Sequence, residues 1–300
     1  MMRLGTWWMA MLAICGAINV AMANETETGQ VVRLPEVKVT EQVLREEQPV
    51  GPYQQPKWTS GGQIGGEAVY VLPAWNAELS QRWFPERDRD GEFDNQFNHE
   101  IEVGLPHRFQ ADFNENWGVD HLGHVEHRGV ELEGRWAPAD WDVIPLNPTV
   151  YLEWEFNNAF SEHGDGDAYE IKLLLAEQIH DRWHWALNAI HEQQVGGERA
   201  TEFKVTQALT YSLIDDSLAI GIEMQFEDTT VAGERDNAEV EFSPGPSLSW
   251  RPTPHSHLDV VPLFGCTGAA PTVEATVVFG IELGAGSDHE ASAPASARGR

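Results

Sequence analysis

Apolar and polar residues alternate with a period of two along most of this chain, and this pattern limits its fold more than any other feature. The stretch "FNHEIEVGLPHRFQADFNENW", residues 97–117, is an example. Apolar side chains such as Ile101 and Phe113 take its odd positions, and polar ones such as Glu100 and Asp112 take the even positions. A period of two is typical of β-strands with one apolar and one polar face. The stretch therefore predicts two strands joined by the turn "PHR".

The same alternation recurs along the chain and predicts about twelve strands. Two of them contain prolines, which lack the N–H needed for a sheet ladder: Pro244 and Pro246 in one, and Pro262 in the next. The expected strands cover residues 75–83, 97–105, 109–117, 130–136, 150–156, 169–175, 183–189, 203–213, 218–226, 240–250, 258–264 and 273–283.

The links between these strands alternate in character. Links after even-numbered strands are mostly tight, such as "PHR" and "IDDS", whereas links after odd-numbered strands are mostly longer or more acidic, such as "PERDRDGEFDN". Tight turns at one rim, longer loops at the other and an even strand count are typical of outer-membrane barrels. The sequence predicts an all-β fold, an antiparallel up-and-down transmembrane β-barrel of about twelve strands, with both termini on the periplasmic, short-turn side.

The tryptophans indicate which face of the strands meets lipid. Alternation alone also fits a secreted soluble β-protein that buries its apolar face. However, apolar-face tryptophans gather near strand ends, where the aromatic girdles of a membrane barrel lie. We therefore expect the apolar face to contact lipid and the acidic face to line the lumen. The tryptophans concerned are Trp83, Trp117, Trp136, Trp154, Trp183 and Trp250.

The two ends of the chain differ from its middle. Residues 1–23 carry one charge, Arg3, and close on Ala21-Met22-Ala23, which predicts a cleaved signal peptide; an uncleaved membrane anchor is the alternative. The polar composition of residues 24–66 predicts a flexible periplasmic segment. The barrel is expected over 67–284, and the small-residue tail 285–300 is expected to be disordered.

The bulk charge excludes some classes of partner. The chain has a net charge of −29, and removal of residues 1–23 takes away one base and no acid, which leaves −30. Nucleic acid is therefore not an expected partner, since its binding needs Lys and Arg. Cys266 is the only cysteine after residue 23, which excludes an intramolecular disulfide.

Residues from about Trp75 to Leu283 resemble Gram-negative outer-membrane barrel proteins of the porin-like or transporter-like kind, such as those of phenol-degradation pathways. The resemblance lies in the architecture, and Phe279 stands for the usual terminal aromatic. It implies an outer-membrane location, contact with outer-membrane lipid, assembly by the barrel-assembly machinery and passage of small solutes or cations. We expect no cofactor.

The stretch "LPEVKVTEQ" is similar to the start of mature TonB-dependent receptors. Too few residues separate it from the first strand to form a plug domain, and such transporters have about 22 strands. TonB-type coupling is therefore not expected.

The polar face carries many more acids than bases. Its expected bases are Arg82, Arg135, Lys172 and Lys204. A lumen so charged attracts cations. We predict a passive, cation-preferring channel or transporter for small solutes; a non-conducting structural or binding barrel with acidic loops is the alternative. The filter residues are expected to be Glu100, Glu102, Asp112, Glu131, Glu133, Glu153, Glu155 and Glu170, and the other inward acids Glu78, Glu202, Glu223, Glu239, Glu241, Asp259 and Glu274.

The long loops contain two weak metal-binding patterns. Asp88 and Asp90 resemble the start of a calcium loop but lack its full ligand spacing. The second pattern is a set of four histidines that could bind Zn²⁺ or Cu²⁺: His121, His124, His127 and His163. Solvated loop side chains are the simpler interpretation of this set.

Catalysis is not expected. The sequence has no G-x-S-x-G turn and no outward Ser and His on neighbouring strands, as a barrel phospholipase would need. Glu153 and Glu155 lie two apart on one face, but this is the ordinary pattern of a lumen wall.

Overall fold

The computed structural model describes residues 43–60, 65, 67–157 and 166–284. The chain separates into two compact units, Met1–Glu41 and Gln42–Arg300, and all described residues belong to the second. Residues 1–23, where a signal peptide is expected, residues 24–42, the tail 285–300 and His163 lie outside the described residues. No helix among the described residues is long and apolar enough to cross a membrane.

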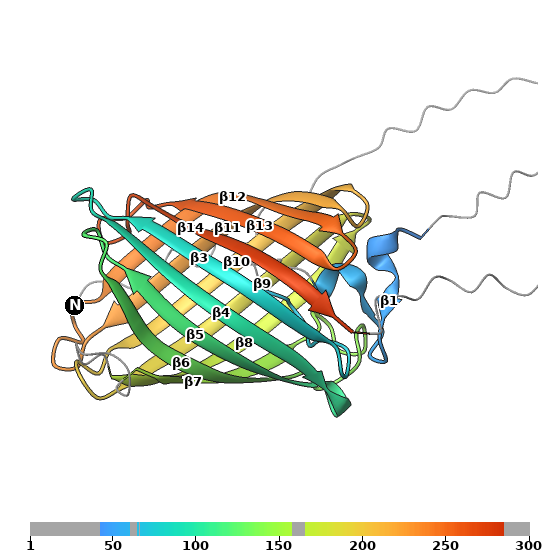
Figure 1. The fold of residues 1–300 in the computed structure, drawn as a ribbon, viewed down its shortest axis with the longest axis horizontal. Coiled ribbons are helices and arrows are strands. Elements are labelled where there is room, and N and C mark those ends of the chain that lie inside the picture. The colour runs from blue at the N-terminus through green and yellow to red at the C-terminus, as the bar shows by residue number, and fades with distance from the viewer. Residues whose placement is uncertain (1–42, 61–64, 66, 158–165, 285–300) are drawn as a thin grey trace, which may run out of the picture. The chain divides into compact units, whose positions relative to one another are not determined.

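Twelve antiparallel strands close into one barrel, in which β14 pairs with β3 and every other strand pairs with its neighbours in sequence (Figure 1). This confirms the predicted fold class and all twelve expected strands, most of which extend further than predicted. The strands are β3 Ala77–Arg87, β4 Phe93–Leu105, β5 Phe109–Val119, β6 Val125–Trp136, β7 Thr149–Phe156, β8 Asp167–His180, β9 Trp183–Val195, β10 Thr201–Ile214, β11 Leu218–Thr230, β12 Glu239–Thr253, β13 Ser256–Phe264 and β14 Val273–Leu283.

The two proline-containing strands form as expected, with a local cost in pairing. The registered pairs between β12 and β13 involve Leu248 to Trp250 and Thr253, and do not include Pro244, Pro246 or Pro262. Proline has no N–H to donate, so the ladder between these two strands is shorter than their lengths would allow.

The exterior of the barrel is apolar and the interior polar. Outward side chains such as Ile222 and Leu152 are 65% and 55% exposed, whereas inward ones such as Glu100 and Arg135 are 3% and 1% exposed. This distribution is the reverse of a soluble protein and is typical of a barrel whose outer wall faces lipid.

The strands are joined at two ends, which we call the turn end and the loop end. The turn end has the links 106–108, 137–148, 181–182, 215–217 and 254–255, and the loop end has 88–92, 120–124, 157–166, 196–200, 231–238 and 265–272. The link 137–148, which follows the fourth barrel strand, lies at the turn end as expected, although it is long. It is long because it packs inward, with Ala137 and Trp141 buried.

The residues before β3 pack inside the turn end of the lumen, and we call the described part of 43–76 the plug segment. It contains the 3-10 helices η1 (Arg45–Glu47) and η2 (Lys57–Ser60) and the short strands β1 (Pro49–Val50) and β2 (Gln55–Pro56). Figure 1 shows β1 at the end of the barrel where the β4–β5 turn lies. The Tyr53 hydroxyl donates to the Leu105 carbonyl at that end, 3.0 Å away.

The plug segment corrects two sequence-based expectations. A flexible segment was expected over 24–66, but residues 43–60 pack against the barrel, with Tyr53 and Trp58 buried. The barrel was expected from residue 67, but its first strand begins at Ala77, and residues 67–76 belong to the plug segment. The reason is that the aromatic residues of this segment follow no period of two. Strand periodicity therefore does not reveal that they fill the lumen.

The buried apolar core of the described residues lies inside the lumen, around the plug segment. Plug residues Trp58 and Tyr70 meet Trp141 edge-on, with ring centroids 5.5 and 5.4 Å apart. Ala176, Ala186 and Ala208 on β8, β9 and β10 belong to the same cluster. The core therefore joins the plug segment to the barrel wall.

Candidate functional site: an acidic lumen

One inward acid on each of nine neighbouring strands lies directly opposite an acid on the next strand. We call this row the acidic ladder. Because barrel strands are tilted, a row that follows the pairing register climbs along the wall. The ladder begins near the turn end, on β14 and β3, and reaches the loop end on β10. Its members are Glu282, Glu78, Glu102, Asp112, Glu133, Glu153, Glu170, Glu192 and Glu202.

Like charges directly opposite each other destabilise a sheet, so the ladder requires counter-charges. Toward the turn end the ladder has a counter-charge at close range, since Arg135 lies 3.2 Å from Glu102 and 3.1 Å from Asp112. Further along, Lys172 lies 2.6 Å from Glu170. The pairing is therefore tight on both sides of the ladder's middle.

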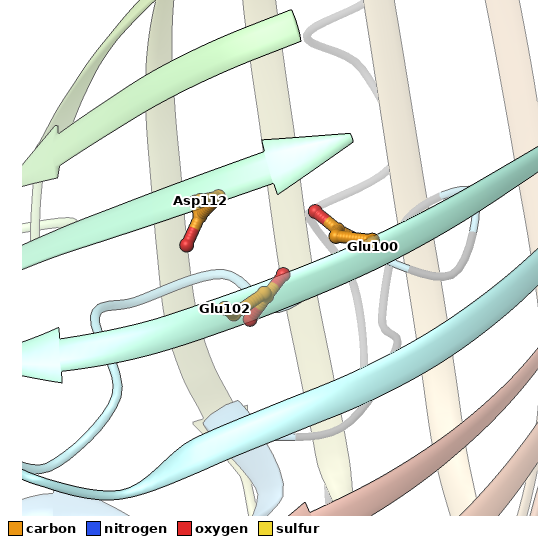
Figure 2. Close-up of side chains that lie close together, drawn as sticks. All are labelled: Glu100, Glu102 and Asp112. Atoms are coloured by element: carbon orange, nitrogen blue, oxygen red, sulfur yellow. The ribbon is translucent and has the colours of Figure 1, made fainter. Parts of the chain in front are cut away.

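Figure 2 shows a trio of acids toward the turn end of the lumen, whose carboxylates lie close together: Glu100 and Glu102 on β4, and Asp112 on β5. One oxygen from each lies within 4.8 Å of the others, a spacing that could hold a metal ion. However, Arg82 Nη2 lies 2.7 Å from Glu100, and Arg135 contacts the other two. Two guanidinium groups thus pair with all three carboxylates of this trio, and it is best described as a buried ion-pair network.

A second trio lies in the middle of the ladder and is paired less closely. Oxygens of Glu131, Glu133 and Glu153 also lie within 4.8 Å of one another. The nearest cations are further away than in the first trio, with Lys172 Nζ at 3.5 Å from Glu153 and Arg135 Nη2 at 3.9 Å from Glu133. The side-chain amides of Asn114 and Asn116 donate to Glu133 and Glu131. These carboxylates are the ones best placed to meet a solute.

The second trio faces a cavity in the loop-end half of the lumen. Its volume is about 430 Å³, and a neighbouring cavity of about 460 Å³ shares Gln96 and Lys204 in its wall. Around the plug segment the cavities are only about 40 and 30 Å³. The charged residues around the 430 Å³ cavity are Glu67, Glu131, Glu133, Glu153, Glu155, Glu170 and Glu192, with Arg82, Arg128, Lys172 and Lys204.

Tyr151 lies at the floor of this cavity between two cations. The Arg135 guanidinium carbon is 5.0 Å and Lys172 Nζ is 4.2 Å from the centre of its ring. Its hydroxyl donates to Glu153 at 3.0 Å. Both cations are therefore attracted to the face of this ring by cation–π contacts.

All eight residues expected in the filter lie on the lumen side of the wall, and Glu100, Glu102, Asp112 and Glu170 are buried there. Their role as a filter stays a prediction. Glu192 was not predicted, because the expected strand over 183–189 ended before it. Glu67 was not predicted, because the chain before the first strand was not expected to enter the lumen. The alternation gave no signal for Glu192, because apolar Ile190 and polar His191 reverse the pattern just before it.

The loop histidines do not converge among the described residues. His124 Nδ1 lies 2.9 Å from Asp120, His127 Nε2 lies 3.3 Å from Glu115, and His121 Nδ1 lies 3.9 Å from Glu92. Each therefore has a separate carboxylate partner. Hydrogen bonds from His124, the backbone N–H first, lower the pKa of Asp120.

The aspartates of the first loop have a simpler role in the structure. Asp88 Oδ1 accepts the backbone N–H groups of Gly91 and Glu92, which is an ordinary turn contact. Asp90 is exposed. Neither residue belongs to a group of metal-ligand donors among the described residues.

Comparison with known proteins supports the fold. No protein-family model and no curated protein matches the sequence. The COG4313 outer membrane channel from Pseudomonas putida F1 is similar in structure, with a TM-score of 0.55 at 9% identity, over 72% of this chain and 98% of that one. The NanC porin has a TM-score of 0.48 at 10% identity, over 70% of this chain and all of that one.

The apolar exterior, the polar lumen and the likeness to the COG4313 channel together show the class of fold of this chain. The chain has the fold of outer-membrane β-barrels, and its architecture is porin-like.

Proposed function

We propose that this protein is a passive outer-membrane channel for small solutes that prefers cations. The acidic ladder is the observation that supports this function most directly. It runs along the lumen wall from one end of the barrel to the other, and its least neutralised part faces a cavity large enough for a small solute.

The electrostatics of the lumen support a preference for cations. The 430 Å³ cavity has seven carboxylates against four cationic side chains in its wall. Charges lining a narrow space with low-dielectric walls focus the field and raise the local concentration of counter-ions. A cation would therefore enter this cavity more readily than an anion, and would lie near Glu131, Glu133 and Glu153.

A second candidate function is a non-conducting barrel that binds a partner through its acidic loops. One observation favours it, namely that the plug segment occupies the turn end of the lumen. The two candidates differ in whether ions can cross the membrane through the barrel.

Export and assembly belong to the same proposal. The signal sequence over residues 1–23 would direct export, and the barrel-assembly machinery would insert the barrel. We include neither enzymatic activity nor TonB-type coupling in this function.

The test is single-channel conductance of the refolded, full-length mature protein in a planar bilayer under a KCl gradient. We expect discrete openings with a reversal potential on the cation side. The variant E131Q/E133Q/E153Q/E155Q should move that potential most of the way to zero, because it removes four charges from the cavity wall.

A matched control removes four charges from exposed positions at the loop end, as E92Q/E198Q/E234Q/D236N. This control should keep the reversal potential of the wild type. Stable insertion without conductance under any condition would support the second candidate, and equal shifts in both variants would show that total charge, not the cavity wall, sets the preference.

A further inference from the structure

Two buried oxygen atoms of residues that line the 430 Å³ cavity have no hydrogen-bond donor among the described residues. They are Asn98 Oδ1 and Glu133 Oε2. Asn98 is 8% exposed, and the side chain of Glu133 is 4% exposed. A buried acceptor without a donor costs free energy, and a ligand that donates hydrogen bonds removes that cost. These two atoms therefore indicate a ligand with N–H or O–H groups.

A chain of hydrogen bonds decides which atom of Asn98 is left over. The ionised carboxylate of Glu131 can only accept, so the Asn116 amide N–H donates to it. The Asn116 carbonyl oxygen in turn accepts from the Asn98 amide N–H, 2.8 Å away. The chain therefore ends in the carbonyl oxygen of Asn98, an acceptor whose donor must come from elsewhere.

The charges of the cavity wall indicate a cation with more than one charge. Glu131 lies directly opposite Glu155, and Glu133 opposite Glu153, so that four acids form a block on the paired strands β6 and β7. Within the described part of the chain, no ion pair involves Glu131, Glu155 or Glu192. Seven carboxylates face four cationic side chains in this wall, a formal excess of three negative charges.

The spacing of these acids suits a linear cation. Neighbouring strands lie about 4.8 Å apart, so the acids of β6 and those of β7 form two rows at about that separation. Ammonium groups joined by three or four methylenes are spaced at a similar distance. One such group can therefore contact Glu131 and Glu133 while the next contacts Glu153 and Glu155. Glu192 lies two strands further along the acidic ladder, on β9, where it can contact a third.

One apolar side chain, Phe84 on β3, lines this cavity among the described residues. Oxygens of Glu131, Glu133 and Glu153 lie within 4.8 Å of one another, a spacing that a metal ion could also bridge. A hydrated metal ion, however, has no apolar part to place against the Phe84 ring. Methylene groups pack on an aromatic ring, and an ammonium group is attracted to its face. Phe84 therefore favours an organic cation.

We propose that this cavity binds linear oligoamines, molecules in which two or three ammonium groups are joined by three or four methylenes. The ammonium groups donate to the acids of β6 and β7 and to Asn98, and the methylenes pack against Phe84. This inference rests on the proposed channel function, for which it names the class of solute.

The first test compares two trivalent cations, spermidine and hexaamminecobalt(III), by isothermal titration calorimetry at one ionic strength. The refolded, full-length mature protein is held in an uncharged detergent. Both cations donate N–H groups, but only spermidine is linear and has methylenes. We expect spermidine to bind with a Kd at least about five-fold lower, since it alone matches the two rows of acids and the aromatic ring.

The variant E131Q/E133Q/E153Q removes three charges from the cavity wall. It should raise the Kd for spermidine about ten-fold or more, because charge-assisted hydrogen bonds are lost. The matched control, E92Q/E198Q/E234Q, removes three charges from exposed positions at the loop end. It should keep the Kd within about two-fold of the wild type, since exposed charges are screened by salt.

A pair of phenylalanine variants tests the apolar contact. F84A should raise the Kd for spermidine about three-fold or more and leave that for hexaamminecobalt(III) unchanged, because only spermidine has methylenes to pack on the ring. F203A is the control, since Phe203 lies on the outer face of β10 and is 47% exposed. It should leave both Kd values unchanged.

Two substitutions of Asn98 separate binding from support of the wall. N98L removes the acceptor at similar volume and should weaken spermidine binding about three-fold or more. N98D keeps an acceptor and should bind spermidine at least as tightly as the wild type. Weakening by both variants to the same degree would show that Asn98 supports the wall and does not contact the ligand. Circular dichroism of each variant confirms that the barrel has folded.

The outcomes separate the solute class from the channel. Equal Kd values for the two cations, together with no effect of F84A, would overturn the oligoamine site and leave a channel for simple cations standing. Spermidine binding that responds to F84A and N98L as expected, in a protein that inserts into planar bilayers without conductance, would support the site and overturn the channel.

Discussion

Trp58 packs inside the turn end of the lumen, in a buried cluster to which the barrel wall contributes three alanines. Longer side chains at Ala176, Ala186 or Ala208 would occupy the space that the indole takes. A buried tryptophan contributes more apolar area than any other side chain, so this one residue accounts for much of the attachment of the plug segment.

At the residue scale we predict that W58A detaches the plug segment without unfolding the barrel. Loss of a buried tryptophan costs about 3–5 kcal/mol, and the barrel strands do not depend on it. Trypsin should cleave after Arg45 and Lys57 at least ten-fold faster than in the wild type, while circular dichroism stays unchanged. W75A is the matched control, because Trp75 belongs to the same segment but is 72% exposed; equal cleavage in both variants would contradict the role of Trp58.

At the element scale, the plug segment is attached to the barrel where the chain enters β3. The Trp75 N–H donates to the Gly104 carbonyl at 2.7 Å, and the Gly104 N–H donates to the Asn76 carbonyl at 2.8 Å. A Cβ on Gly104 would collide with the backbone carbonyls of Pro73 and Leu72. Glycine is therefore required here for close approach of two backbones rather than for an unusual φ.

We predict that G104A pushes residues 72–73 away from β4 and loosens the plug segment. Trypsin should cleave after Lys57 several-fold faster than in the wild type, because the segment is displaced where it enters β3. G134A on β6 is the control, since a Cβ there meets no atom within 4 Å. An unchanged cleavage rate in G104A, with the variant folded, would show that the contacts of residues 72–73 do not hold the plug segment in place.

At the scale of the whole molecule, the apolar surface lies outside and the charges lie inside. The pairing of inward acids with inward bases allows a chain of net charge −29 to close a barrel around them. The core of the described residues is formed by the plug segment, and the barrel wall itself is stabilised by hydrogen bonds between strands and by its lipid surroundings.

We predict that arginine is costly on the outer wall and tolerated on the inner one. I222R places a charge on the lipid face near the middle of β11 and should lower the free energy of unfolding in vesicles by about 2–4 kcal/mol. Q225R, on the same strand but facing the 460 Å³ cavity, should change it by less than about 1 kcal/mol. Urea titration followed by tryptophan fluorescence measures both, and equal losses would contradict the assignment of the two faces.

Local periodicity was sufficient to predict the strands and their faces. The alternation at Ile101 or Phe113 is a property of neighbouring residues, and it decides which side chains point to lipid whatever the partner strand is. The twelve strands and the inward direction of the expected filter acids could therefore be predicted from the sequence alone. Strand ends were less well predicted, which is why Glu192 was missed.

Two features were decided only by the tertiary structure. The acidic ladder depends on the pairing register, because a shift of two residues between β6 and β7 would keep every face and yet place Glu133 opposite Tyr151 instead of Glu153. The plug segment depends on contacts across the lumen, such as Glu67 with Lys172, between residues far apart in the chain. The sequence by itself determined a barrel with a polar lumen, since that follows from local pattern; the closing of that lumen follows from three-dimensional packing, which no local pattern encodes.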